Sequence, residues 1–297
     1  MGVCRYCGQK AGWFADAHEA CLTSARQGID VLSKTVASAL DQGKAFSEIK
    51  ASIDQIVAQY GVPVEDIHNA LVQGWSTGAG KIALAEPLSM DKHLALVDFY
   101  KGAGLTGEEL VKTEGFKTVA ASLILWCVMN GTPESIACEF PQPFNLQSNE
   151  IPVLFFGSVV YSQETITHSY QGEYAGVSVR VGHGLYYHLG GLEGQRVEKA
   201  SLQEIDYGGL LFTTSNIYFG GEHKVFRVPY GHIVSFKPFA DGIGIFRDGA
   251  NARPEVFTIV NAWSSCGALL YNLAHFLAQP EARALYAGYK YSRQQPS

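Results

Sequence analysis

Residues 208–220, GGLLFTTSNIYFG, decide the fold of the second half of this chain. Aromatic and β-branched residues fill the stretch and glycines bracket it, which predicts two strands' worth of β-structure. The same composition extends to both sides, because 16 of the 32 glycines lie between residues 151 and 250. Of the 35 aromatic residues, 23 follow residue 150. Long apolar helices rarely have this composition, so the sequence predicts two different architectures in one chain.

Further strands lie on either side of this stretch. Alternating or continuous apolar runs begin at Ile151 and recur until Val260, and residues 176–180 and 185–189 read as the two arms of a hairpin. A helix of about residues 262–278 follows, with Leu269, Leu273 and Leu277 at helical spacing. Roughly seven or eight antiparallel strands followed by one amphipathic helix predict a small barrel or orthogonal sandwich that is capped at one end.

Three segments of this half resemble GRAM and bacterial PH-like domains: residues 209–219, 226–236 and 241–246, followed by the terminal helix. The shared phrase is a strand of the form G-x-L-x-x-T-x-x-x-(L/I)-x-F and a later strand that ends I-P-(L/Y)-x-x-I-x-x-(V/F). The resemblance implies a domain that binds phosphoinositides, peptides or other proteins. Phosphoinositide binding in PH domains relies on basic residues in the first hairpin, whereas Tyr161–Ser178 offers only His168 beside Glu164 and Glu173.

A second chemical pattern stands at the N-terminus. Cys4, Cys7, His18 and Cys21 have the spacing C-x2-C-x10-H-x2-C, which suits four ligands around one tetrahedral metal ion. We expect a structural zinc, because so short a segment cannot bury a core without one. Gly8 follows the knuckle where a Cβ would crowd the sulfurs. The alternatives are a catalytic zinc, a disulfide or redox pair, and a nucleic-acid-reading finger.

Between these two ends, residues 24–132 read as a run of short helices. One helix carries an apolar face from Phe46 to Tyr60 and ends at Gly61, and Pro63 stands near the start of the next. A further helix is capped by Ser89 and carries Leu94, Val97 and Tyr100. Residues 106–109 form a capping box, and 116–129 are almost entirely apolar, which predicts a central helix. This middle is reminiscent of TerB-like tellurite-resistance domains in its helix lengths and acidic capped turn.

Two glycine-rich stretches in the helical part imitate nucleotide-binding motifs. Residues 74–81 suggest a P-loop, but Trp75 and Ile82 stand where glycine and Ser or Thr are required. Residues 102–107 match G-x-G-x-x-G, yet the stretch follows a helix and reads better as a helix stop followed by a cap. A nucleophile pair of Cys266 and His275 rests on spacing alone.

The sequence therefore predicts an α+β fold in three parts. These are a zinc knuckle over residues 1–26, a loosely TerB-like helical bundle over 27–145, and an antiparallel PH-like β-barrel or sandwich with a C-terminal helix over 146–297. The N-terminus has no signal-peptide pattern and the longest apolar run is too short to span a bilayer, so we expect a cytoplasmic protein.

These features predict a non-enzymatic interaction or sensing protein with a protein partner, by analogy in bacterial stress or phage defence. The net charge of −6 weighs against nucleic acid and, with the hairpin, against anionic lipid. The alternatives are a membrane-surface adaptor that binds lipid through the PH-like part, and a hydrolase with a site between the helical and β halves. No catalytic set emerges from the residue spacing.

Overall fold

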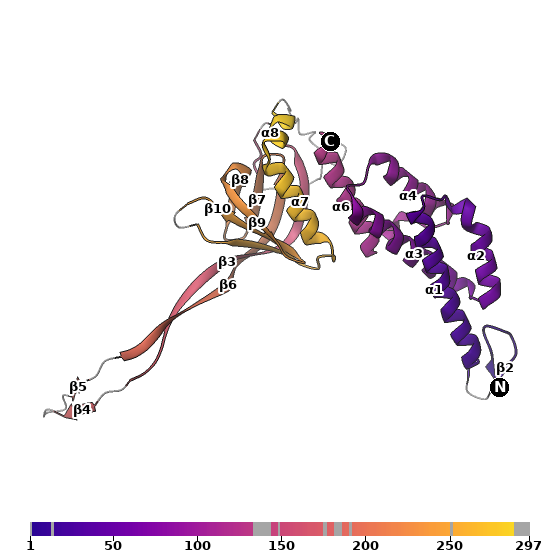
Figure 1. The fold of residues 1–297 in the computed structure, drawn as a ribbon, viewed down its shortest axis with the longest axis horizontal. Coiled ribbons are helices and arrows are strands. Elements are labelled where there is room, and N and C mark those ends of the chain that lie inside the picture. Colours follow the sequence, from indigo (N-terminus) through magenta and orange to yellow (C-terminus); the bar gives the residue numbers. More distant parts are fainter. Residues whose placement is uncertain are drawn as a thin grey trace.

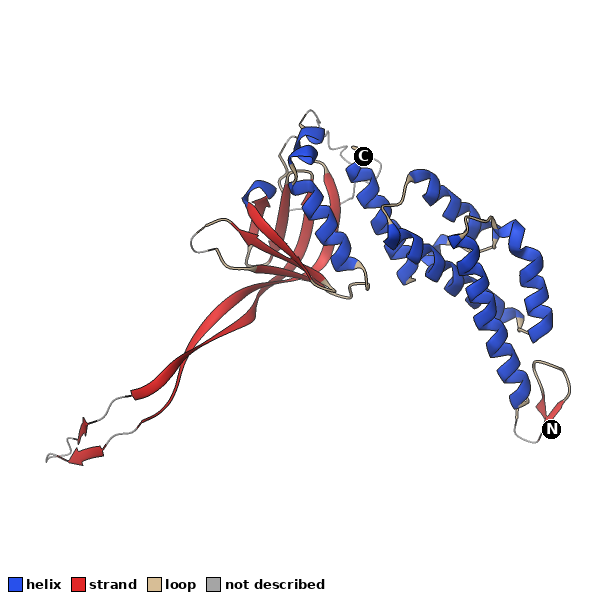
Figure 2. Ribbon diagram, viewed as in Figure 1, coloured by secondary structure: helices blue, strands red, loops and turns tan. Residues whose placement is uncertain are grey.

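The computed structural model describes residues 2–12, 15–132, 144–147, 149–174, 177–180, 186–189, 192–249 and 252–287. Helices make up the first half and a strongly bent sheet the second, and a two-stranded ribbon projects from the sheet (Figures 1 and 2). The fold is thus α+β, as the composition predicts. No helix in the described part of the chain combines the length and apolarity needed to cross a bilayer.

The helical half begins with a two-stranded hairpin, β1 (Gly2–Val3) with β2 (Lys10–Gly12), and continues as six helices. Their bounds are α1 Glu19–Asp41, α2 Phe46–Tyr60, α3 Val64–Ala85, α4 Met90–Gly102, α5 Gly107–Leu110 and α6 Glu114–Met129. The predicted stops and caps are confirmed. Gly61 is left-handed with φ 62°, Ser89 accepts from the Lys92 N–H, and the carboxylate of Glu109 accepts from the Thr106 N–H at 2.9 Å.

The buried face of α4 differs from the prediction. Leu94 is 52% exposed, whereas Leu96 and Phe99 are buried. Phe99 packs edge-on against Phe46, and the Leu96 carbonyl accepts a hydrogen bond from the indole of Trp75. The predicted set, Leu94 and Val97, and the buried set, Leu96 and Phe99, both repeat at helical spacing. Only the neighbours of α4 therefore decide which set faces the core.

The P-loop-like stretch lies inside α3 and serves helix packing. A Cβ on Gly74 would lie 2.6 Å from the Ser33 carbonyl oxygen of α1, and a Cβ on Gly78 would lie 2.8 Å from the Cα of Ala37. Gly115 of α6 approaches α3 in the same way, with an ideal Cβ only 2.0 Å from the Ser76 carbonyl oxygen. The glycines therefore let α1, α3 and α6 approach closely, and α3 follows helix α2 rather than the strand that a P-loop requires.

The second half is a seven-stranded antiparallel sheet in the order β8-β7-β6-β3-β11-β10-β9. The strands are β3 Pro152–Tyr174, β6 Leu192–Thr213, β7 Asn216–Gly221, β8 Val225–Pro229, β9 Ile233–Pro238, β10 Gly242–Arg247 and β11 Glu255–Ile259. The edge strands β8 and β9 are joined by only three residues, Tyr230–His232. Such a link spans at most about 14 Å, whereas a flat sheet of seven strands is roughly 29 Å wide. The sheet must therefore curl into a half-barrel.

Helix α7 (Cys266–Ala278) fills the concave side of the half-barrel and α8 (Pro280–Tyr286) follows it. The core between α7 and the sheet is fully apolar at Leu270, Leu273 and Leu277 on the helix. An ideal Cβ on Gly267 would lie 1.6 Å from the Phe239 carbonyl oxygen, so this glycine lets α7 rest directly on the β9–β10 turn. The predicted C-terminal cap of the sheet is confirmed.

The first hairpin is longer than the sequence suggests. β3 and β6 stay paired from Pro152 and Thr213 out to Tyr174 and Leu192. The predicted hairpin of β4 (Val177–Arg180) with β5 (Tyr186–Leu189) is confirmed and lies at the far end of this ribbon. The strand that returns from the tip therefore brings Arg196 and Lys199 into the same hairpin.

The two halves meet where α6 packs along α7. The Glu114 carboxylate accepts from the Ser264 N–H at 2.8 Å, and the hydroxyls of Thr118 and Ser265 lie 2.9 Å apart. At the other end of α6, the Tyr286 hydroxyl donates to the Val128 carbonyl. The predicted central position of the 116–129 helix is thus confirmed. The predicted boundary at 145/146 falls between α6 and β3, and the one at 26/27 falls within α1; residues 1 and 288–297 lie outside the described residues.

Candidate metal centre

The four predicted ligands converge at the N-terminal end of the bundle. The sulfurs of Cys4, Cys7 and Cys21 and one ring nitrogen of His18 all lie within 4.8 Å of one another. Cys4 and Cys7 come from the turn between β1 and β2, whereas His18 directly precedes α1 and Cys21 lies in the first turn of that helix. The group can hold one metal ion, and the fold brings the two cysteines of the turn beside the two ligands at the start of α1.

His18 presents its Nδ1 atom to the cluster. Nδ1 lies 3.4 Å from the Cys7 sulfur and 3.7 Å from the Cys21 sulfur, while Nε2 lies 3.0 Å from the Lys10 carbonyl oxygen. A carbonyl only accepts, so Nε2 carries the proton and the lone pair of Nδ1 faces the sulfurs. Such an outer hydrogen bond orients metal-binding histidines and fixes their tautomer.

The electrostatics of the sulfurs favour a cation between them. Burial raises the pKa of the Cys4 thiol, but backbone N–H groups, that of His18 first, lower it to about 6. Burial raises the pKa of the Cys21 thiol to about 11, and the sulfurs of Cys7 and Cys4 act in the same direction. Negative charge on one sulfur thus opposes ionisation of the next, and a bound divalent ion removes that opposition.

The role of Gly8 differs from the prediction. A Cβ at this position would meet nothing within 4 Å, so it would not crowd the sulfurs. Gly8 instead has φ +70°, a left-handed conformation that favours glycine, and its N–H donates to the Cys4 carbonyl at 2.8 Å. The glycine therefore makes the tight turn that returns the chain towards His18.

The metal-ligand segment is attached to the bundle through few contacts. Cys4 is the one buried residue between positions 2 and 24 in the part of the chain that the structure describes. The Ser24 hydroxyl donates to the Tyr60 carbonyl at 3.2 Å and ties the first turns of α1 to the end of α2. Apart from Cys4, the described part of this segment has no buried residue that could form a core.

The Cys266 and His275 pair is not assembled. Nine residues separate them on α7, which corresponds to about 13 Å along the helix axis. Burial raises the pKa of the Cys266 thiol to about 12, so the sulfur stays protonated near neutral pH. The thiol belongs to the half-barrel core. His275 stacks on Tyr271 at a ring separation of 5.7 Å.

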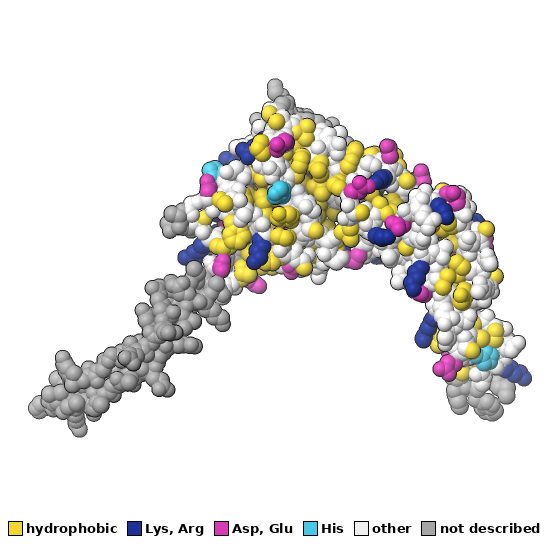
Figure 3. Space-filling view, in the orientation of Figure 1, with side chains coloured by type: hydrophobic (Ala, Val, Ile, Leu, Met, Phe, Trp, Pro, Cys, Tyr) yellow, Lys and Arg dark blue, Asp and Glu magenta, His cyan; other side chains and the backbone are white. Residues whose placement is uncertain are grey.

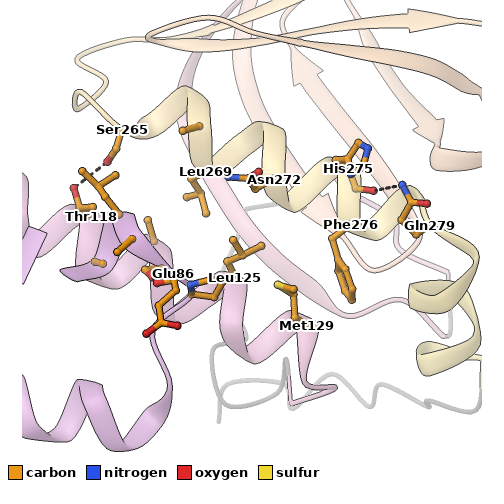
Figure 4. Close-up of a pocket in the computed structure, with 17 residues that line it drawn as sticks. Glu86, Thr118, Leu125, Met129, Ser265, Leu269, Asn272, His275, Phe276 and Gln279 are labelled. Atoms are coloured by element: carbon orange, nitrogen blue, oxygen red, sulfur yellow. Dashed lines mark hydrogen bonds between the residues drawn. The ribbon is translucent and has the colours of Figure 1, made fainter. Parts of the chain in front are cut away.

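A groove of about 470 Å³ lies between the helical and β halves, lined by the end of α3, by α6 and by α7. Figure 4 shows Leu269 and Phe276 of α7 facing Leu125 and Met129 of α6 across it. At the level of sequence, a site between the two halves is expected only as the location of the alternative hydrolase. The walls of the groove could not be predicted, because only the packing of α6 on α7 creates them.

In comparisons with known proteins, no family model, no curated protein and no solved structure matches this chain.

Proposed function

We propose that this chain is a non-enzymatic, zinc-containing interaction or sensing protein of the bacterial cytoplasm. Its PH-like half would dock a protein partner, by analogy in a stress or phage-defence response. The convergence of Cys4, Cys7, His18 and Cys21 carries the proposal. Four protein ligands complete a tetrahedral shell and leave no position for substrate, which is typical of a structural rather than a catalytic zinc.

The distances from the His18 Nδ1 atom to two of the sulfurs support zinc. Bonds of about 2.3 Å to sulfur and 2.0 Å to nitrogen place tetrahedral ligands roughly 3.5–3.8 Å apart. The His18 nitrogen lies 3.4 and 3.7 Å from two of the sulfurs. Three thiolates and one imidazole are the ligand types that structural zinc prefers. The bound ion would supply the folding free energy that the segment's few contacts do not.

The topology of the second half supports a PH-like domain. The strands follow one another as a meander from β3 to β8, and β9 to β11 return to β3, so that the sheet bends around the terminal helix α7. Gly242 of the resembling segment 241–246 lies where β10 meets β11, since an ideal Cβ on it would come within 2.0 Å of the Phe257 carbonyl oxygen. The helical half is assigned as TerB-like on the resemblance alone.

Charge favours a protein partner over an anionic lipid. The complete hairpin, residues 152–213, contains six Asp and Glu and three Lys and Arg. The returning strand adds Arg196 and Lys199, but it also adds Glu193 and Glu198. Phosphate groups would therefore meet an acidic hairpin on an acidic chain. A lipid-binding adaptor remains the second candidate and an enzyme between the two halves the third.

Elemental analysis tests the zinc. We expect about one zinc per chain, lost in Cys4→Ser and in His18→Asn. The matched control is His232→Asn, which changes an exposed histidine that faces Asp248 on the half-barrel. Natively purified protein without metal, or variants that keep it, would contradict the assignment.

Affinity purification from the native host, read by mass spectrometry, tests the partner class. A reproducible protein partner supports the proposal, whereas a co-purified metabolite supports an enzyme or ligand sensor. Flotation with anionic vesicles at physiological salt is the counterpart for lipid. Clear co-flotation would replace the protein-docking proposal with the membrane-surface adaptor.

A further inference from the structure

The groove between α6 and α7 is held open by contacts at both of its ends. The Glu114–Ser264 and Thr118–Ser265 hydrogen bonds join the helices at one end, and Tyr286 of α8 joins α6 at the other. α6 contributes Val119 to the core of the helical half and Val128 to the core of the half-barrel, which also holds α7, so the space between the two helices is part of the fold.

The lining of the groove is apolar and partly exposed to solvent. Leu125 and Phe276 are half-buried, Leu84 is 65% exposed and Met129 is 43% exposed. The helix surfaces between these larger residues carry small side chains: Ala83, Ala85, Ala121, Ser122 and Ala268. Figure 3 shows hydrophobic side chains gathered over this junction of the two halves. A contiguous apolar patch of this kind is typical of an interaction surface.

The charge of the lining restricts the occupant. Among the described residues that line the groove, Glu86 is the one carboxylate, His275 the one imidazole, and none is Lys or Arg. Glu86 pairs with Lys92, and both side chains are more than half exposed. An exposed pair of this kind contributes little, so an incoming cation can replace Lys92. An acidic or phosphorylated segment would find no cation among the described lining residues, and Lys92, beside the groove, is already paired with Glu86.

The shape of the groove favours a helix. The walls of the groove are helices, and small residues on them allow a third helix to pack with its axis about 8–10 Å from theirs. α7 is 13 residues long, about 20 Å, which matches an incoming helix of three to four turns. Side chains at helical spacing on that helix would reach Leu125, Phe276 and Met129.

We propose that this groove is the docking site for an amphipathic helix of a partner protein, with an apolar face and basic rather than acidic flanks. The inference rests on the proposed function, because it names the site and the chemistry of the partner that the interaction protein would bind. The docking site thereby combines α6 and the end of α3 from the helical half with α7 of the β half.

The test uses two labelled synthetic peptides of 14 residues and fluorescence anisotropy with the full chain at physiological salt. One peptide places leucines on one helical face and lysines on the other, and the second replaces every lysine by glutamate. Ala268→Lys adds a cation in the exposed centre of the groove, and Ala51→Lys makes the same change on the exposed face of α2. Both variants alter net charge equally, so only position distinguishes them.

We expect the leucine–lysine peptide to bind the wild type and Ala51→Lys alike, and to bind Ala268→Lys about tenfold more weakly, a loss of about 1.4 kcal/mol. We expect the leucine–glutamate peptide to bind the wild type weakly. Three results would overturn the proposal: no binding of the leucine–lysine peptide to the wild type, equal affinity of that peptide for both variants, or a higher affinity of the wild type for the leucine–glutamate peptide. If Ala268→Lys still captures the host partner in affinity purification, the groove is not the docking site, although the proposed function stands. If the wild type captures no partner, the proposed function itself is wrong.

Discussion

Replacing Gly74 by alanine tests whether the glycine-rich stretch of α3 serves helix packing. The added Cβ would lie 2.6 Å from the Ser33 carbonyl oxygen and 2.7 Å from the Cβ of Val36. Ordinary contacts begin near 3.4 Å, so α1 and α3 would have to separate by about 0.8 Å along a seam that buries Leu32, Val36 and Trp75. Neither obstructing atom is the end of a flexible side chain, so the helices themselves must shift.

The expected loss of stability follows from two opposing terms. Overpacking of this kind costs about 1–3 kcal/mol or more, and alanine in a helix interior recovers about 1 kcal/mol relative to glycine. Because the shift affects the whole seam, we place the overpacking cost at about 3 kcal/mol and expect a net loss of about 2 kcal/mol, which lowers the melting temperature by roughly 4–8 °C. Urea unfolding followed by far-ultraviolet circular dichroism measures the free energy, and a thermal scan measures the shift.

Gly107→Ala is the matched control. Gly107 opens α5, is exposed, and has nothing within 4 Å of an added Cβ. This variant should be neutral or more stable by up to about 1 kcal/mol. If Gly74→Ala is as stable as Gly107→Ala, the close approach of α1 and α3 is wrong and the packing explanation of the P-loop-like stretch fails.

Three further predictions concern the contacts that hold the parts together. The hydrogen bond from the Ser264 N–H lowers the pKa of the Glu114 carboxyl. The stability that the Glu114 carboxylate contributes is therefore present above its unfolded pKa of about 4.3 and is lost as the pH falls through its folded pKa. Glu114→Gln should lower the urea midpoint at pH 7 and lower it less at pH 3. An equal loss at both pH values would contradict this. Arg247→Met should cost about 3 kcal/mol, because its guanidinium lies 2.6 Å from the buried carboxylate of Glu255. Adding Glu255→Gln should restore most of that stability in urea unfolding, and a double variant no better than the single one would contradict it. Chelation of the metal should speed hydrogen exchange in residues 2–22 and leave the main thermal transition unchanged, because this segment adds almost nothing to the bundle core; loss of the main transition would show a wider role.

The metal-ligand set could be predicted from the sequence because ligand type and spacing already restrict what four such residues can do. Which nitrogen of His18 faces the sulfurs could not, because the Lys10 carbonyl that orients the ring comes from a separate strand. The prediction that a Cβ at Gly8 would crowd the sulfurs was wrong, because crowding depends on neighbours that the sequence does not show. The glycine is needed instead for the left-handed φ of its turn.

The same division runs through the fold. The helix ends at Gly61, Ser89 and Thr106, the strand-rich second half and the terminal helix could all be predicted from the chain's local pattern. Caps, turns and periodicity act over a few residues, so their signals are local. The buried face of α4, the length of the β3–β6 hairpin and the groove between α6 and α7 became known only from the folded chain. Those outcomes depend on packing between segments distant in the chain, for which the local pattern permits several equally good arrangements.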